Sequence, residues 1–330
     1  PWENLNQEYD PYQGIPLEIG YITASSPPIV ANGVVIVGNS AEQGYNQTRI
    51  ENVPGDILAY DVSTGDFKWK FHVIPRPGEV GHETWLNDAW QTTGDVSSWA
   101  PMSADQERGI VYIPTNPPTI DYFGGFRPGN NLFGTSVIAL NAETGERVWH
   151  FQTVHNDQWN YDIPNVPIIV DLDVDGRAVS AVVQTSKTGM IYAFDRESGE
   201  PIWPIEEKPV VQTVVPGNWT AETQPIPTRP ESAEPFGLPE KDVIDFTPEM
   251  HAEALEIISR YQVGGPFMPR LYDDHSTGFE DNIRCYGGLN ITNPATLDPS
   301  TGILYMASAR RCSGGSVAVG IEADDPANPR

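Results

Sequence analysis

The segment AYDVSTGDFKW, Ala59 to Trp69, returns twice with the same spacing of its polar, glycine and tryptophan positions. The second copy is ALNAETGERVW, Ala139 to Trp149, and the third is AFDRESGEPIW, Ala193 to Trp203. The shared pattern is A-x-[DN]-x-x-[ST]-G-x-x-x-W, in which Asp or Asn can bond its own backbone and Gly can adopt positive φ. A tight turn between two strands needs both properties, so each copy predicts a hairpin.

Further hairpins are expected before or between these copies. They turn at Asn32-Gly33, near Gly109 and at Asp175-Gly176, each between runs rich in β-forming residues. Two hairpins make one four-stranded sheet, and the tryptophans of successive copies are 80 and 54 residues apart. This irregular period is typical of propeller blades that carry long inserted loops. The segment PATLDPSTGILYMASA, 294–309, begins one more hairpin.

We therefore expect an all-β chain, a β-propeller of four-stranded blades of which about four are present, with residues 1–330 as a single partial propeller domain. A propeller needs about four to eight blades to close, so the other blades would come from the remainder of a longer chain or from another polypeptide. Residues 204–265 read as an inter-blade insertion, an extended strap followed by one helix. Thr247 would cap that helix and Pro248 would occupy its first turn.

The composition indicates a globular, strongly acidic protein. Asp and Glu number 45 against 19 Lys and Arg, a formal net charge of −26, which repels phosphate backbones and argues against nucleic acid as a partner. Solubility or salty surroundings explain such acidity more readily than an acidic binding face does. No run of 18 apolar residues occurs, and the first residues do not resemble a signal peptide, so either a leader has been removed or the sequence is a fragment.

The two cysteines, Cys285 and Cys312, are not spaced as a zinc pair. One disulfide between them would suit an oxidising compartment, and two separate buried thiols are the alternative. Both interpretations stay open at this point.

The run HNDQWNYDIP, His155 to Pro164, crowds Asp, Asn, His, Trp and Tyr side chains together directly after an expected strand. Together with the tryptophan repeats, this run resembles the pyrroloquinoline quinone (PQQ) dependent dehydrogenases, most closely the quinoprotein glucose dehydrogenase branch. These are eight-bladed propellers that hold the quinone and a metal ion in a central funnel. The resemblance implies oxidation of an alcohol or aldose by PQQ with Ca2+ or a lanthanide. It also implies an electron acceptor that is a quinone or cytochrome, and a periplasmic or secreted location.

Several site residues follow from the resemblance alone. In VVIVGNSAEQG, 34–44, Glu42 would be a carboxylate ligand of the metal and Ser40 would contact the cofactor. Asn116 would be a further ligand through its carbonyl oxygen, since hard cations prefer oxygen. Trp99 would stack under the quinone, and Lys187 would contact a quinone carbonyl, where a cation stabilises developing negative charge. Core packing for Trp99 and a plain turn for Lys187 are the structural alternatives.

The sequence departs from the family at the catalytic base. Relatives commonly carry Trp-Asp where this chain has Trp159-Asn160, and an amide cannot accept the substrate proton, although it can ligate a cation. The base would then be Asp162, Asp157 or His155, or it is absent. Asp162 would face the same side of an extended segment as Asn160. Lanthanide-using relatives carry an extra acidic ligand at that offset, so Asp162 would be metal ligand, base or both.

A rival interpretation treats the same run as a structural loop and the protein as a non-catalytic propeller, a scaffold or binding platform that has lost the base. The amide at Asn160 favours this interpretation. The joint presence of Glu42, Trp99 and Lys187 favours the enzyme.

Overall fold

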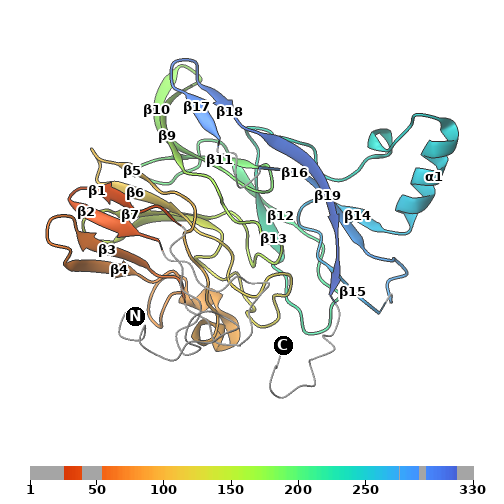
Figure 1. Cartoon of the computed structure of the whole chain (residues 1–330), viewed down its shortest axis with the longest axis horizontal. Coiled ribbons are helices and arrows are strands. Elements are labelled where there is room, and N and C mark those ends of the chain that lie inside the picture. The colour runs from red at the N-terminus through yellow and green to blue at the C-terminus, as the bar shows by residue number, and fades with distance from the viewer. Residues whose placement is uncertain (1–25, 39–53, 275, 290–294, 318–330) are drawn as a thin grey trace.

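Two four-stranded antiparallel sheets, each with its strands in chain order, follow one another in the computed structural model, which describes residues 26–38, 54–274, 276–289 and 295–317 (Figure 1). The first sheet consists of β1 (Ile29–Ala31), β2 (Val34–Val37), β3 (Ile57–Asp61) and β4 (Phe67–Phe71). The second consists of β5 (Ser103–Asp105), β6 (Ile110–Pro114), β7 (Ser136–Asn141) and β8 (Arg147–Gln152). These sheets confirm the first two predicted blades.

The third blade is less regular than predicted. It has three strands, β9 (Ile168–Val174), β10 (Arg177–Thr185) and β11 (Ile191–Asp195), and the expected fourth strand is reduced to a single bridge between Phe194 and Pro201. The physical reason is the proline, which has no N–H to continue the ladder.

The predicted turns are confirmed by their backbone angles. Asn32 and Gly33 have φ of 47° and 79°, and Asp175 and Gly176 have 53° and 79°, the doubly positive pattern of a type I′ hairpin. The repeat turns share one contact, because the [DN] side chain accepts bonds from the two backbone N–H groups that follow by two and three positions. Those side chains are Asp61, Asn141 and Asp195.

The repeat tryptophans join neighbouring blades. Trp69 donates from Nε1 to the carbonyl of Ala142 at 3.0 Å, and Trp149 donates to the carbonyl of Arg196 at 3.1 Å. In both cases the acceptor follows the [DN] residue of the next blade. The turn glycine of that blade lies against the indole, since a Cβ on Gly145 would come within 2.5 Å of Trp69. The repeat therefore supplies both halves of a contact between blades.

The second blade is buried on both faces. Along β7, Ile138 and Leu140 pack against the first blade, whereas Val137 and Ala139 pack towards the third, as the alternation of side chains along a strand requires. Complete burial of a large apolar side chain contributes roughly 1.5–3 kcal/mol, so this central blade carries much of the stability of the described region.

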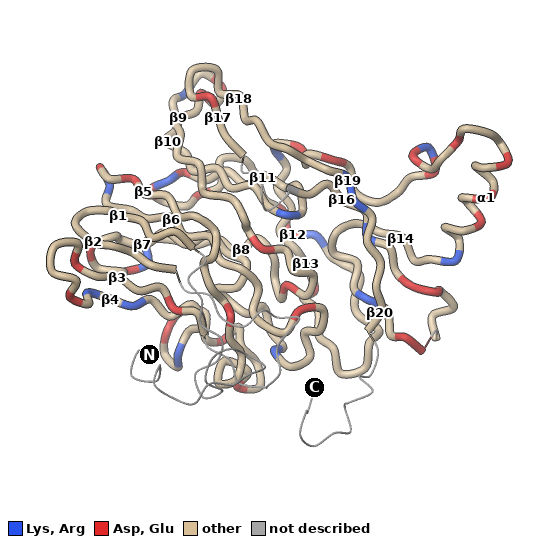
Figure 2. Tube along the Cα trace, viewed as in Figure 1, with Lys and Arg blue, Asp and Glu red and all other residues tan. Residues whose placement is uncertain are grey.

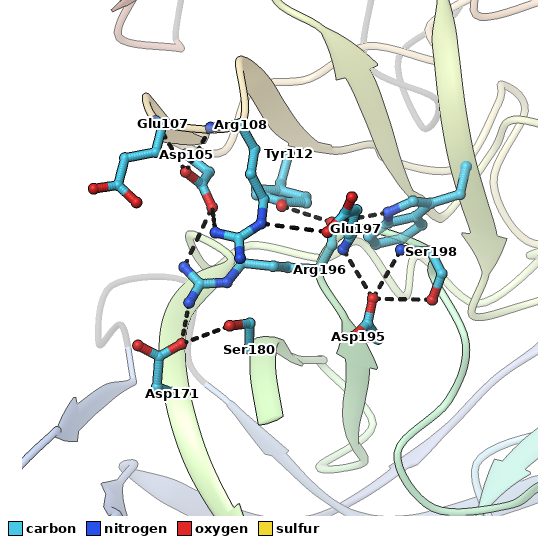
Figure 3. A network of polar contacts seen from close by, with 11 residues as sticks. Asp105, Glu107, Arg108, Tyr112, Asp171, Ser180, Asp195, Arg196, Glu197 and Ser198 are labelled. Carbon is cyan, nitrogen blue, oxygen red and sulfur yellow. Dashed lines mark hydrogen bonds and ion pairs between the residues drawn. The ribbon is translucent and has the colours of Figure 1, made fainter. Parts of the chain in front are cut away.

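A polar network also ties the second blade to the third (Figure 3). Arg196, at the end of β11, forms ion pairs with Asp105 of the second blade and Asp171 of the third. Tyr112 of β6 donates to the Arg196 carbonyl at 2.7 Å. Figure 2 shows acidic residues spread over the sheets and helix.

Residues 204–265 contain more strand than the predicted strap. β12 (Ile205–Pro209) and β13 (Thr223–Pro227) form a two-stranded hairpin, followed by α1 (Pro248–Ser259). Thr247 caps α1 as predicted, since its Oγ1 accepts from the N–H of Met250 at 3.2 Å. α1 projects away from the blades (Figure 1) and buries none of its residues. Within the described residues, no helix has the length and apolar character needed to cross a membrane.

The last part of the described chain forms three small sheets. β16 (Asn282–Leu289) lies between β14 (Gln262–Gly264), which is parallel to it, and β19 (Ser308–Gly314), which is antiparallel. Cys285 and Cys312 are cross-strand partners and form a disulfide, so the first of the two open alternatives is confirmed. β15 (Leu271–Tyr272) pairs with β20 (Ser316–Val317), and β17 (Thr296–Asp298) with β18 (Ile303–Tyr305) is the further hairpin that the sequence predicts.

Candidate functional site

Four residues from three separate segments meet at one point. The Nζ atom of Lys187 lies 3.0 Å from Oδ2 of Asp162 and 2.7 Å from Oδ1 of Asn160, and it also donates to the Asn160 carbonyl at 3.1 Å. Trp99 donates from Nε1 to Oδ2 of Asp162 at 3.2 Å. The structure thus brings together the predicted stacking, cofactor-contacting and acidic residues, although they are far apart in the sequence.

Core packing fixes the direction of the acidic segment. Trp159 and Tyr161 are buried in the cluster that fills the space between the second and third blades. Asn160 and Asp162 alternate with them in the sequence and contact Lys187. Lys187 lies in the turn between β10 and β11. In this turn the N–H of Ser186 donates to the carbonyl of Met190.

Asp157 holds the loop together. Its carboxylate is 2% exposed and accepts from the N–H groups of Trp159 and Tyr161, at 2.8 and 2.9 Å, and from the hydroxyl of Thr135 at 2.9 Å. Burial raises the pKa of this carboxyl group, and the hydrogen bonds oppose the shift. These contacts give Asp157 a structural role in the loop, as a cap for the N–H groups of Trp159 and Tyr161.

His155 contacts strand β12. Its ring nitrogens lie 2.7 Å from Oε1 of Gln152 and 3.2 Å from Oε1 of Glu207 in β12. Neither contact involves the group around Asp162. Among the three candidate bases, Asp162 is the one that contacts Lys187 and Trp99.

Asp121, a carboxylate that the sequence did not predict at the site, also contacts Asn160. Asp121 is 7% exposed, and its Oδ2 accepts from Nδ2 of Asn160 at 2.8 Å. Burial raises its pKa to about 6, the negative charge of Asp162 adds to the shift, and the bond from Asn160 opposes it. Asp121 lies in the irregular loop PPTIDYFGGF, 117–126, where no periodic pattern marks it; its one signal was an acidic residue among apolar and aromatic neighbours.

Arg127 links the loop that contains Asp121 to the segment that contains Asn160 by hydrogen bonds. Its guanidinium is fully buried and donates to Oδ1 of Asn131 at 2.9 Å, to the carbonyl of Ile120 at 3.2 Å and to the carbonyl of Asp157 at 2.5 Å. Burial lowers its pKa to about 10, and Asp157 and Asp121 oppose that shift. The guanidinium keeps its positive charge at neutral pH and joins the two segments.

The oxygens around Lys187 are of the kind that hard cations prefer. Oδ1 of Asp162 is buried and has no hydrogen-bond partner among the residues that the structure describes, which is costly for a carboxylate unless another group satisfies it. Within the described ranges, no three His, Cys, Asp or Glu side chains are grouped so that they would hold a metal ion. Glu42 and Ser40, the predicted ligand and cofactor contact, lie outside those ranges. Oδ1 of Asp162 is an oxygen donor of the kind that Ca2+ or a lanthanide prefers, whereas Oδ1 of Asn160 accepts from Lys187.

Asn116 is bonded to its own surroundings. Its Oδ1 accepts from the hydroxyl of Ser97 at 2.9 Å, and its Nδ2 donates to the carbonyl of Asp95 at 2.6 Å. No contact among the described residues joins its side chain to Asp162 or Asn160. Trp99 is partly buried, and its bond to Asp162 fixes the indole beside the carboxylate.

The sequence matches one family over nearly its whole length. The family model for the PQQ glucose/ethanol/alcohol dehydrogenase β-propeller domain matches residues 5–324. The chain is 32% identical over 288 residues to the glycerol dehydrogenase large subunit of Gluconobacter oxydans, an alignment that covers 86% of this chain and 37% of that protein. It is 34% identical over 209 residues to the quinoprotein glucose dehydrogenase of Escherichia coli, covering 63% of this chain and 25% of that protein.

The fold has a counterpart among solved structures. The quinohemoprotein alcohol dehydrogenase of Comamonas testosteroni matches with a TM-score of 0.51 at 22% identity, over 82% of this chain and 37% of that one. This likeness confirms the predicted all-β propeller architecture. The chain spans well under half the length of the relatives that it matches.

Proposed function

Because the chain belongs to the PQQ glucose/ethanol/alcohol dehydrogenase β-propeller family, we propose that it forms part of a PQQ- and metal-dependent enzyme that oxidises an alcohol or aldose to the carbonyl product. The observation that carries this proposal is the contact of Lys187 and Trp99 with one carboxylate, Asp162. A charged lysine, an indole and a buried acid are what a quinone and a hydroxyl substrate need side by side.

Each residue has a role in this proposal. The Trp99 ring would support the flat face of the quinone, and Lys187 would face a quinone oxygen, where its charge stabilises negative charge as it develops. Asp162 would take the substrate hydroxyl proton, because Asn160 cannot. The metal ligands would be Asp162, Asn160 and Glu42, with Asn116 and Ser40 in the roles that the resemblance gives them.

PQQ, when bound with its metal ion, supplies the acceptor of the two electrons removed from the substrate carbon. The residues of the protein chain position the groups around the substrate. Asp162 is buried, 8% exposed, and Lys187 bonds its Oδ2. Oδ1, which has no hydrogen-bond partner among the described residues, would be the atom that accepts the proton or binds the cation.

The proposed protein is larger than this chain. The chain would form one partial propeller domain with an insertion at 204–265, and further blades would complete the funnel. Trp203, the third repeat tryptophan, packs with Leu297 of β17 and Leu304 of β18 against the core cluster of the third blade. The electron acceptor would be a quinone or cytochrome. The disulfide supports a periplasmic or secreted location, since disulfides persist in oxidising compartments.

The test is dye reduction by the full-length protein loaded with PQQ and either Ca2+ or a lanthanide, over a panel of alcohols and aldoses. We expect turnover that requires both additions and that Asp162→Asn lowers at least a hundredfold. The matched control is Asp171→Asn, whose side chain is 69% exposed, away from Lys187. Binding of PQQ without turnover of any substrate would favour the non-catalytic propeller to which the amide at Asn160 points.

A further inference from the structure

The carboxamide of Asn160 lies between two opposite charges. Its Nδ2 donates to Oδ2 of Asp121 at 2.8 Å, and its Oδ1 accepts from Nζ of Lys187 at 2.7 Å. One amide therefore connects a buried carboxylate to the ammonium group that also pairs with Asp162.

The two charges allow one orientation of this amide. Nδ2 can only donate and Oδ1 can only accept. A half turn of the side chain would place the NH2 group against the ammonium of Lys187 and the carbonyl oxygen against the carboxylate of Asp121. Both contacts would then be repulsive, so Asp121 holds Oδ1 of Asn160 towards Lys187.

The backbone on both sides is built to keep this contact. Asn160 has a φ of 61°, a left-handed conformation that Asn tolerates better than most residues. Arg127 bonds the carbonyl of Ile120, next to Asp121, and the carbonyl of Asp157, in the segment of Asn160. Asp121 is 7% exposed and is repelled by the charge of Asp162. Burial of such a carboxylate costs folding free energy, so we expect a role that compensates for this cost.

We propose that Asp121 is a positioning residue, which acts through the amide of Asn160 to hold the ammonium of Lys187 at its place in the site. The effect of Asp121 on catalysis rests on the proposed function. The geometric content of the proposal, a Lys187 ammonium held through Asp121 and Asn160, is independent of PQQ and substrate.

The geometric content is tested on the protein without PQQ, by measuring the acylation rate of each lysine by mass spectrometry. Asp121→Leu removes the acceptor for Asn160, whereas Asp121→Asn keeps an oxygen that can accept the same bond. We expect Lys187 to react about tenfold faster in Asp121→Leu, equivalent to about 1.4 kcal/mol, because its ammonium loses the charged group that is bonded through Asn160. In Asp121→Asn the rate is expected within about threefold of the wild type.

The acylation rates of Lys208 and Lys241, measured in the same experiment, are the internal control for folding. Both lysines lie in residues 204–265, far along the chain from Asp121. Their rates should not change. If Asp121→Leu does not fold, Asp121→Ser takes its place, because its shorter hydroxyl lacks the reach of the carboxylate. An unchanged Lys187 rate in the folded variant would overturn the proposal, and so would an Asp121→Asn variant that behaves like Asp121→Leu.

In the loaded full-length enzyme, we expect Asp121→Leu to lower kcat with little change in the KM of the alcohol, and Asp121→Asn to recover most of the loss. A fall in kcat that Asp121→Asn does not recover would contradict the positioning role. If no loaded protein turns over any substrate, the proposed function fails, while the labelling result still decides whether Asp121 positions Lys187.

Discussion

The Nζ atom of Lys187 and the Oδ2 atom of Asp162 lie 3.0 Å apart, with side chains that are 19% and 11% exposed. Because both charged groups are largely removed from water, each stabilises the other, and removal of one would leave the other buried and unpaired at a large cost in folding free energy. The same pair joins the turn between β10 and β11 to the segment that follows β8. The contact is therefore both a structural tie between blades and the centre of the proposed site.

Replacement of Lys187 by Met should affect both roles. The variant keeps the length of the side chain but leaves Asp162 without its cation, so we expect the free energy of unfolding to fall by about 3 kcal/mol in urea. In the loaded full-length enzyme, kcat should fall about a hundredfold or more. Lys208→Met is the control, because the Lys208–Glu206 pair is exposed, 54% and 51%, and should contribute little. A loss of stability as small as that of the control would contradict a tightly coupled pair.

The contact between blades can be tested at the turn glycines. Gly65 and Gly145 occupy the same repeat position, with φ of 77° and 75°. A Cβ on Gly65 would meet no described atom within 4 Å, whereas a Cβ on Gly145 would meet the Trp69 ring. Alanine at either site should cost roughly 1–2 kcal/mol for its backbone conformation. Gly145→Ala should cost a further 1–3 kcal/mol, roughly, from overpacking. Equal losses in thermal unfolding of the two variants would argue against the contact.

His150 should make stability depend on pH. Burial and then the charge of Arg147 lower its pKa to about 4, and its Nδ1 lies 3.0 Å from Nη1 of Arg147. In the unfolded chain the imidazole takes up a proton near its ordinary pKa of 6.5, whereas in the folded chain it stays neutral until about pH 4. Stability is therefore full above about pH 6.5 and falls as the pH drops towards 4, by about 2–3 kcal/mol from this group.

His150→Gln removes this proton uptake. The difference in unfolding free energy between wild type and variant, measured in urea at pH 7, 6 and 5, should shift steadily against the wild type as the pH falls. His251→Gln, on α1, is the control for replacing an imidazole elsewhere in the chain. A constant difference between wild type and His150→Gln would show that His150 is not the responsible group.

The disulfide should stabilise the sheet of β16 and β19. It closes a loop of 27 residues, for which the loop-entropy relation gives about 3–4 kcal/mol. Cys312→Ala breaks the bond at its exposed end and leaves the buried side chain of Cys285 in place. Amide exchange in β16 should become faster, while exchange in β6 and β7 stays unchanged. Equal protection of β16 with and without the bond would contradict the expected stabilisation.

Regular parts of the molecule were predictable from the sequence because their turns demand particular residues. The three [DN]-x-x-[ST]-G turns and their tryptophans fix the blades, and the alternation from Trp159 to Asp162 fixes which side chains face the core. The hairpin β12–β13 was missed because prolines at 209, 225 and 227 hide a strand pattern, although a two-stranded hairpin has only edge strands and tolerates them.

The partner of Asn160 was not predictable for a different reason. Asp121 reaches the site through an irregular loop whose path is set by Arg127 and by contacts with other blades. Loops of this kind carry no periodic pattern, so nothing in the sequence ties Asp121 to Asn160 before the fold is known.

We propose that Asp162 and Glu42 bind one cation at the mouth of the propeller. Anomalous diffraction from a lanthanide in crystals of the full-length protein with PQQ tests it most directly. We expect one strong peak about 2.3–2.6 Å from carboxylate oxygens of both residues, with Oδ1 of Asp162 among them. A lanthanide bound only at surface carboxylates, with Oδ1 of Asp162 uncoordinated, would contradict it.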